Sequence, residues 1–350
     1  MGTCDFCKAE SEEQLKSCVC KKASYCSKEC QAKDWKSHKP SCPPFIIRES
    51  PGKGRGLFAT RNIKEGQLIL EEYPLLTISD GKSLHEFTAI YYPNIEEDTK
   101  AKILKLHDPA ENLKNLDNDI VEKLASKTDE SSKIYRIFIG NSFPICGEEW
   151  YDTTEFGLYN NISLINHACV PNATKSWVMG DFKRQQVKAM KTIEKDEEIL
   201  VNYQCGSEVD FGSREFRMQE LLGLNGILCS CSECSLEGEA LVNNDLMRAE
   251  LREKAAEITQ LLRLYPLPRR DVKKAMKLSQ QHTKLLQKLG LRAAFVPAMI
   301  GFYCAAIMAR RMDISILEND PEVFKQEALK YAKMFGDRYI HYYNKNINNF

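Results

Sequence analysis

The sequence predicts an α+β protein in three successive parts: a small zinc-bound N-terminal module, a β-rich middle and a helical C-terminal part. Three observations predict this fold class. Seven of the 14 cysteines lie in the first 42 residues. Glycine-containing turns and short strand patterns then continue to Tyr203. Beyond Glu237 strand patterns stop, and apolar residues recur at helical spacing instead.

The length and the charge balance of the chain limit the kinds of binding partner that we expect. The 350 residues suffice for two or three domains, and 49 basic residues balance 49 acidic ones. A formal net charge of zero gives no overall attraction to nucleic acid or to an anionic membrane. The N-terminus has no signal-peptide core, so we expect a cytoplasmic or nuclear protein, or both, and a monomer. The apolar stretch Ala293–Ala309 is short for a bilayer and contains Pro297, which predicts a buried helix and no membrane partner.

The N-terminal module contains eight candidate zinc ligands in four closely spaced pairs: Cys4 and Cys7, Cys18 and Cys20, Cys26 and Cys30, His38 and Cys42. Each pair can grip one side of a tetrahedral ion, so eight ligands predict two closed, structural sites. The alternative is a disulfide cluster, which a reducing compartment disfavours. A segment this polar has almost no core, and zinc binding of on the order of 10–16 kcal/mol per site would fold it.

These pairs resemble the MYND finger, which holds two zincs in a cross-braced arrangement. Tyr25 to Gln31 (YCSKECQ) and the Trp35-x2-His38 spacing strengthen the resemblance. It implies that the first and third pairs share one zinc and that the second and fourth pairs share the other. It also implies a finger that binds proline-rich peptides. The second pair is Cys-x-Cys where the family usually has Cys-x2-Cys, so we expect a local distortion without loss of the ion.

Four further motifs follow in order: the glycine turn 52–59, the segment 161–172 (NISLINHACVPN), the strand 197–203 (EEILVNY) and Cys229-x-Cys231-x2-Cys234. The glycine turn alone predicts only a tight hairpin, since it matches no phosphate-binding loop. Together the four resemble the SET-domain lysine methyltransferases and, with the finger, the SMYD family. Because the finger precedes the SET domain, the arrangement resembles the arthropod SmydA or Msta branch.

The resemblance implies a domain organisation and a third zinc site. The finger spans 1–42, the SET domain 43–207 with a helical insert at about 81–140, the post-SET segment 208–237 and a TPR-like helical domain 238–350. Cys229, Cys231 and Cys234 supply three thiolates, and a closed zinc site needs four. The family takes the fourth from the position of Cys169, giving three zinc ions in all. The other three cysteines, Cys146, Cys205 and Cys304, are expected to be buried free thiols.

The same resemblance implies S-adenosylmethionine as cofactor and a protein lysine as substrate. The expected cofactor-binding residues are Lys53, Gly54, Arg55, Asn141, Asn166 and His167. The lysine amine must lose a proton, which costs about 4–5 kcal/mol at pH 7, and must align with the methyl group. Tyr203 would orient the amine as the catalytic residue, because a phenol is a poor base at neutral pH.

One departure leaves a rival hypothesis open. The stretch 225–228 (NGIL) stands where the family usually has aromatic residues that stack on adenine and line the lysine channel. A smaller change is Ala168 in place of a serine. We therefore expect a protein-lysine N-methyltransferase acting on histone or other proteins in transcriptional regulation. The alternative is a weak or silent SET scaffold that serves as an adaptor or corepressor through its finger.

Local patterns place the remaining elements. Residues 83–135 are predicted to be helical, while 182–190 and 198–203 are predicted strands. Helices are expected near 244–264, 271–289, 297–311 and 321–343. Pro321 suits the start of the last helix, and Gly290 suits the end of the second.

Overall fold

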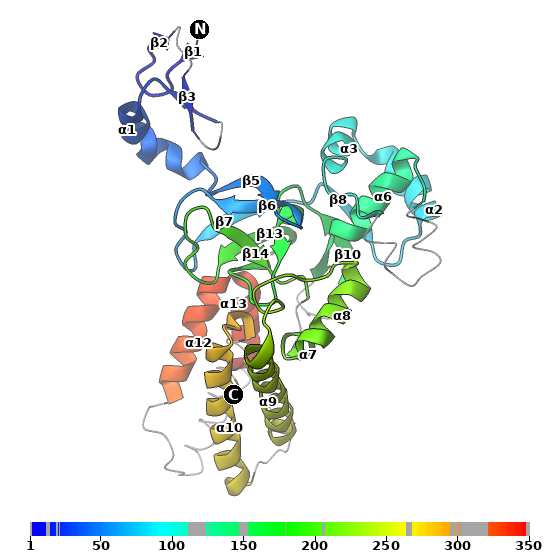
Figure 1. Cartoon of the computed structure of the whole chain (residues 1–350), viewed down its shortest axis with the longest axis vertical. Helices are drawn as coiled ribbons and strands as arrows, with labels where there is room; N and C mark the ends of the chain where they lie inside the picture. Colours follow the sequence, from blue (N-terminus) through cyan, green and yellow to red (C-terminus); the bar gives the residue numbers. More distant parts are fainter. Residues whose placement is uncertain are drawn as a thin grey trace.

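The computed structural model describes residues 2–11, 15–18, 20, 22–110, 124, 126–146, 153–178, 180–204, 207–263, 268–294, 298, 301 and 321–347. Figure 1 shows an elongated molecule with the N-terminal finger at one end and the C-terminal helices at the other. The β-rich part lies between them, and a helical insert projects from its side. This arrangement confirms the predicted α+β fold class.

The finger consists of two short hairpins and a helix. Strand β1 (Gly2–Thr3) pairs with β2 (Glu10–Ser11), and β3 (Lys16–Ser17) pairs with β4 (Ser24–Tyr25). Helix α1 (Lys28–His38) follows and leads into the 3-10 turn η1 (Lys39–Ser41). Ser27 begins the helix because its hydroxyl accepts the backbone N–H of Cys30 at 3.2 Å. The helix thus starts with one ligand pair and ends at His38.

Three small sheets form the β-rich part. The first has the order β11-β14-β6-β5, the second β12-β13-β7 and the third β8-β10-β9. Pairing is antiparallel except between β11 and β14. The strands are β5 (Phe45–Ser50), β6 (Gly54–Ala59), β7 (Leu68–Glu72), β8 (Leu76–Ser79), β9 (Phe143–Cys146), β10 (Thr153–Leu158), β11 (Asn166–His167), β12 (Ala173–Val178), β13 (Asp181–Ala189) and β14 (Glu198–Val201).

The described part of the insert between β8 and β9 is mostly helical, as expected, with turns and coil between its helices. It contains α2 (Leu84–Glu86), the π-helical turn η2 (Phe87–Tyr91), η3 (Tyr92–Asn94), α3 (Glu97–Ile103) and α6 (Glu130–Asn141). Arg136 of α6 is 4% exposed and pairs with Asp108 through two hydrogen bonds of 2.6 and 2.7 Å. The apolar faces of α3 and α6 join the core of the three sheets.

The chain then turns helical. Helices α7 (Ser207–Asp210) and α8 (Arg214–Asn225) precede the post-SET loop, and α8 ends at Gly226, whose φ of 66° places it in the left-handed region. Helices α9 (Gly238–Arg263) and α10 (Arg269–Lys288) match two predicted helices. The turn η5 (Arg292–Ala294), α12 (Pro321–Phe335) and α13 (Asp337–Ile347) complete the described residues. Gly290, with φ 69°, follows the end of α10 as predicted.

The predicted helix 321–343 is wrong in one respect, because the chain breaks at Gly336 into α12 and α13. Gly336 has φ 114°, which only glycine adopts readily. A Cβ there would lie 2.6 Å from the Ser176 hydroxyl and 2.8 Å from the Gln186 amide. The helical domain therefore bends where its backbone touches β12 and β13, a contact that local sequence does not reveal.

The predicted strand 198–203 is also shorter than expected. Strand β14 ends at Val201, and Asn202 and Tyr203 lie in the bend beyond it. The backbone N–H of Tyr203 donates to His167 Nδ1 at 3.1 Å, so a side chain takes the place of a strand partner. The bend turns Tyr203 toward the cavity described below.

Several expectations lie outside the described residues. Most of the predicted helix 297–311, and with it most of the stretch 293–309, is among these, as are Cys205 and Cys304. The backbone of Cys146 belongs to β9, but its side chain is not described. Within the part of the chain that the structure describes, every helix is too short or too polar to span a bilayer.

Candidate active site and metal centres

The eight ligands of the finger form two compact groups. Cys4, Cys7, Cys26 and Cys30 gather in one group, and Cys18, Cys20, His38 and Cys42 in the other, with ligand atoms within 4.8 Å of one another. Sulfur atoms are 3.5 Å apart in the Cys26–Cys30 pair and 3.7 Å apart in the Cys18–Cys42 pair. A tetrahedral zinc with Zn–S bonds of about 2.3 Å separates its sulfurs by roughly 3.8 Å. Both groups therefore fit zinc, in the cross-braced pairing expected.

The shortened Cys-x-Cys pair keeps both ligands in place. Cys18 is buried and Cys20 is half-buried, and the Cys20 sulfur lies 3.2 Å from Nε2 of His38. The N–H of Lys22 donates to the Cys20 sulfur at 3.4 Å. All four ligands of this group therefore still converge, although this pair is one residue shorter than the family pattern.

A third group joins two distant segments. Cys169 follows β11, while Cys229, Cys231 and Cys234 belong to the loop after α8, and all four are buried within one 4.8 Å group. The sulfurs of Cys169 and Cys234 are 3.5 Å apart, which again suits a tetrahedral zinc. Sequence spacing could not join Cys169 to the loop by itself. The fold does so because Ala168 and Cys169, directly after β11, pack in one cluster with Leu221 of α8 and the cysteines of the loop.

A single cavity of about 970 Å³ adjoins this third group. Its wall contains all the expected cofactor residues and the expected catalytic residue: Lys53, Gly54, Arg55, Asn141, Asn166, His167 and Tyr203. The insert contributes residues from the end of α6, α8 contributes its last residue, Asn225, and the loop after it contributes Ile227 and Leu228. Five stretches that are far apart in the sequence, 53–55, 141, 166–167, 203 and 225–228, thus meet around one space.

Glu198 is not part of the cavity wall, but its carboxylate binds two residues that are. Its carboxylate accepts from Lys53 Nζ at 3.3 Å and from Asn166 Nδ2 at 2.8 Å. Asn166 Nδ2 also donates to the carbonyl of Arg55 at 3.1 Å. A Cβ on Gly56 would lie 2.5 Å from the Glu198 carboxylate and 2.9 Å from the Asn166 amide, so a larger residue there would displace this pair. The sequence analysis did not select Glu198. Side chains alternate between the two faces of a strand, so Glu198 could have been placed on the face of β14 opposite the buried Ile199.

Asn141 is fixed at the end of α6. Its amide donates to the carbonyls of His107 at 2.9 Å and Ile137 at 2.7 Å, and its own carbonyl accepts from the Ser163 hydroxyl at 2.8 Å. Gly140 precedes it because a Cβ there would collide with Pro109 at 2.4 Å. The insert and the SET core therefore hold this cavity residue from both sides.

Tyr203 closes the inner part of the cavity. Its hydroxyl donates to the carbonyl of Ile165 at 2.8 Å, and its ring meets the rings of Phe143 and His167 at 6.2 and 5.3 Å between centroids. Burial, followed by the negative charge of Glu198, raises the pKa of Tyr203 well above its usual value. The phenol therefore stays protonated at neutral pH and can orient groups without acting as a base.

The imidazole of His167 links Tyr203 to the third metal group. Nδ1 accepts the backbone N–H of Tyr203, so the ring proton lies on Nε2, which is 3.6 Å from the Cys169 sulfur. The resemblance had implied that His167 binds the cofactor. The structure adds that this side chain joins the cavity to a metal ligand, as the outer contacts of metal sites commonly do.

The stretch 225–228 forms one edge of the cavity with aliphatic side chains. Ile227 is half-buried against the third cysteine group, and Leu228 is 66% exposed. The expected aromatic surface is therefore replaced here by Ile227 and Leu228. A flat ligand group can still contact aliphatic carbon, but without ring stacking.

Comparison with known proteins agrees with this architecture. A model of the SET domain matches residues 54–204, and a model of the MYND finger matches residues 4–42. Mouse histone-lysine N-methyltransferase SMYD3 is 27% identical and covers 74% of this chain and 58% of its own length. Arabidopsis thaliana histone-lysine N-methyltransferase ASHR1 is 29% identical, with 67% and 47% covered. Bos taurus N-lysine methyltransferase SMYD2 is 26% identical, with 74% and 57% covered.

The finger, the sheets around one cavity and the closed cysteine group define a zinc-binding SET-domain protein. Three Cys and His clusters accommodate three zinc ions. The chain belongs to the SMYD family, which joins a MYND finger to a SET domain. It spans about half the length of the curated relatives it matches. SET-domain methyltransferases use S-adenosylmethionine, and the charged, amide and apolar groups of the cavity suit its amino-acid, ribose and adenine parts.

Proposed function

We propose that the chain transfers a methyl group from S-adenosylmethionine to a lysine amine of a protein substrate. The observation that carries the proposal is that Tyr203 and the six expected cofactor residues border one cavity. When bound, the cofactor supplies a methyl group on a sulfonium. Lys53 and Asn166, both held by Glu198, would bind its amino-acid part, while Ile227 would contact its ring.

Tyr203 would orient the attacking amine. Its hydroxyl proton is directed at the Ile165 carbonyl, which leaves the hydroxyl lone pairs to accept from a lysine amine. Desolvation in the cavity and repulsion by the sulfonium would both disfavour the ammonium form of an incoming lysine, which would assist its deprotonation. The contribution of the chain is therefore alignment and exclusion of water rather than strong acid or base chemistry.

One strand pairing supports part of the proposed domain limits. Strand β5 pairs with β6 from Phe45 to Ser50, which supports starting the SET domain before residue 54. We propose 43–207 for this domain, 208–237 for the post-SET segment and 238–350 for the helical domain. The finger would occupy 1–42.

The finger would bind proline-rich peptides. Such peptides dock on exposed aromatic faces, and α1 carries the half-buried Trp35. The guanidinium of Arg61 lies 5.3 Å from the Trp35 ring centre, which holds the indole at the junction with the SET domain. Quenching or enhancement of Trp35 fluorescence by a proline-rich peptide, absent in Trp35→Phe, would test this partner.

The decisive experiment is calorimetric titration of the zinc-loaded protein with S-adenosylhomocysteine. We expect micromolar binding that Asn166→Ala loses, because this change removes the amide that joins Arg55 to Glu198. Asn62→Ala is the matched control, since the Asn62 amide oxygen accepts from Lys195 outside the cavity wall. If the folded wild type does not bind, the proposal is wrong, and a silent SET scaffold with an adaptor finger replaces it.

A further inference from the structure

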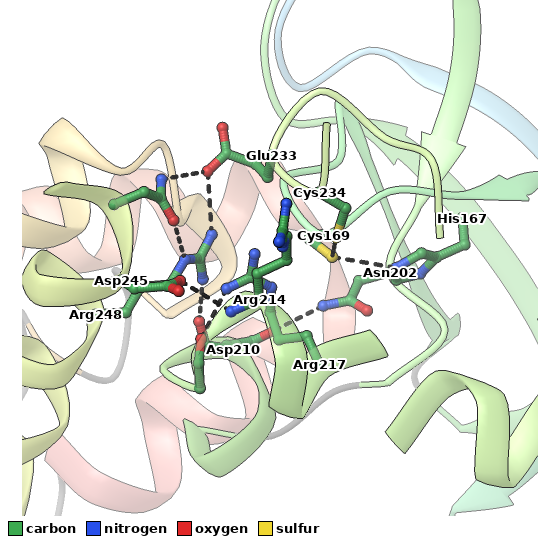
Figure 2. A network of polar contacts seen from close by, with 12 residues as sticks. His167, Cys169, Asn202, Asp210, Arg214, Arg217, Glu233, Cys234, Asp245 and Arg248 are labelled. Carbon is green, nitrogen blue, oxygen red and sulfur yellow. Dashed lines mark hydrogen bonds and ion pairs between the residues drawn. The ribbon is translucent and has the colours of Figure 1, made fainter. Parts of the chain in front are cut away.

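Two arginines are buried beside the third cysteine group. Arg217 of α8 is 3% exposed, and Arg248 of α9 is fully buried. Figure 2 shows both in one polar network with Cys169, Cys234 and Glu233. A buried guanidinium is costly to desolvate and normally requires a matched anion. The two arginines differ in how that requirement is met.

Arg248 is satisfied by ordinary partners. Its Nε donates to the Asn244 amide at 2.9 Å, its Nη2 donates to Glu233 at 3.3 Å, and its Nη1 donates to the carbonyl of Asp210. Glu233 lies directly before the metal ligand Cys234. Arg248 therefore fastens the post-SET loop to the first helix of the C-terminal domain.

Arg217 is only partly satisfied. Nη1 donates to the carbonyl of Gly212 at 2.7 Å, but the described residues offer no oxygen or nitrogen acceptor to Nε or Nη2. The sulfurs of Cys169 and Cys234 are neighbours of the Arg217 side chain in this buried region. The positive charge of Arg217 also contributes, after burial, to a lowered pKa of Arg248. Arg217 and Arg248 thus lie in one buried region, where the Glu233 carboxylate pairs with Arg248.

The buried guanidinium of Arg217 needs an anion, and a zinc site with four thiolate ligands would be one. Four thiolates around one zinc ion carry two negative charges in excess. In a buried region such a charge is strongly unfavourable without a cation nearby. We propose that Arg217 is the counter-charge of the third zinc site, and that its guanidinium sets how tightly the four thiolates hold the ion.

This proposal does not depend on methyl transfer, because its readout is the zinc ion itself. The purified full chain would be equilibrated with graded concentrations of a chelator, and bound ions would be counted by native mass spectrometry. Cys229→Ser, which removes one ligand of the third group, would identify the ion that belongs to that site. Arg217→Met should lower the affinity for this zinc ion on the order of 10- to 100-fold, the usual range when an outer contact of a metal site is removed. The two finger ions should keep their affinities.

Two further variants separate charge from burial. Arg217→Lys keeps the positive charge and should retain zinc within a few-fold of wild type. Arg136→Met removes an equally buried arginine of the insert, whose partner is Asp108, and should lower stability without changing any zinc affinity. An unchanged third ion in Arg217→Met would overturn the proposal. So would equal zinc loss in a folded Arg217→Lys, since shape rather than charge would then be responsible.

Discussion

The hydroxyl of Tyr203 donates a 2.8 Å hydrogen bond to the backbone carbonyl of Ile165, the residue directly before β11. This bond fixes the phenol at the inner part of the cavity, while its ring rests edge-on against Phe143. A residue at the end of a strand is thereby held by the segment that also contains Asn166 and His167. The geometry supplies a direct test of what the hydroxyl does.

Tyr203→Phe should lower methyl transfer on the order of 100-fold while leaving the affinity for S-adenosylhomocysteine within a few-fold of wild type. The ring contacts persist, so the loss of one hydrogen bond should cost only about 1 kcal/mol of stability. Transfer would be followed with radiolabelled cofactor, and affinity by calorimetry. Full retention of turnover would remove Tyr203 from the proposed mechanism.

Glu198→Gln should weaken cofactor binding by roughly tenfold, which corresponds to about 1.4 kcal/mol. The change preserves the shape but removes the charge that positions Lys53, whose side chain is 24% exposed. Glu197→Gln is the matched control, because the Glu197 side chain accepts from Asn172 and the Glu194 backbone instead. The dissociation constant of the control for S-adenosylhomocysteine, measured by calorimetry, should lie within about twofold of the wild-type value. Equal losses in both variants would contradict a specific role for Glu198.

Gly336→Ala should destabilise the protein by about 1–3 kcal/mol. The new methyl group would meet the Ser176 hydroxyl at 2.6 Å, and φ 114° is strained for any residue with a Cβ. Gly223→Ala in α8 is the control, since nothing lies within 4 Å of its Cβ and a helical alanine should add up to about 1 kcal/mol. Thermal unfolding should shift in opposite directions for the two variants.

Alkaline stability should depend on Tyr159. Burial, followed by the charge of Glu72, raises the pKa of this tyrosine above its usual value, and its hydroxyl donates to the Lys183 carbonyl at 2.8 Å. The unfolded chain releases this proton near pH 10 while the folded chain keeps it, so stability is present below about pH 10 and falls above it. Urea titrations between pH 8 and 11 should show a shallower decline for Tyr159→Phe. An identical decline in the wild type and in Tyr159→Phe would show that other titratable groups determine the alkaline loss of stability.

Loss of zinc from the finger should leave the cavity intact. Cys30→Ser removes one ligand of the first group, and no described finger residue lines the cavity. Hydrogen exchange should therefore accelerate in the finger and stay slow in β12 and β13, which belong to the SET core. Affinity for S-adenosylhomocysteine should not change. Reduced affinity would instead reveal that the finger supports the SET domain.

The sequence by itself determined the order of the parts and the ligands of the finger. Zinc ligands need fixed types and short spacings, so Cys26-x3-Cys30 and His38-x3-Cys42 are visible in the chain without any fold. Helix periodicity likewise predicted α9 and α10, because one face of each helix is buried. These features depend on neighbours a few residues apart.

Only the tertiary structure decided the features that join distant segments. It placed Glu198 behind Lys53 and Asn166, put the imidazole of His167 between Tyr203 and Cys169, and buried Arg217 beside the third cysteine group. It also broke the last predicted helix at Gly336, where β12 and β13 approach the backbone. Such contacts depend on which surfaces meet after folding, and a local pattern contains no information about a partner that lies 32 or 145 residues away, as for the partners of Glu198.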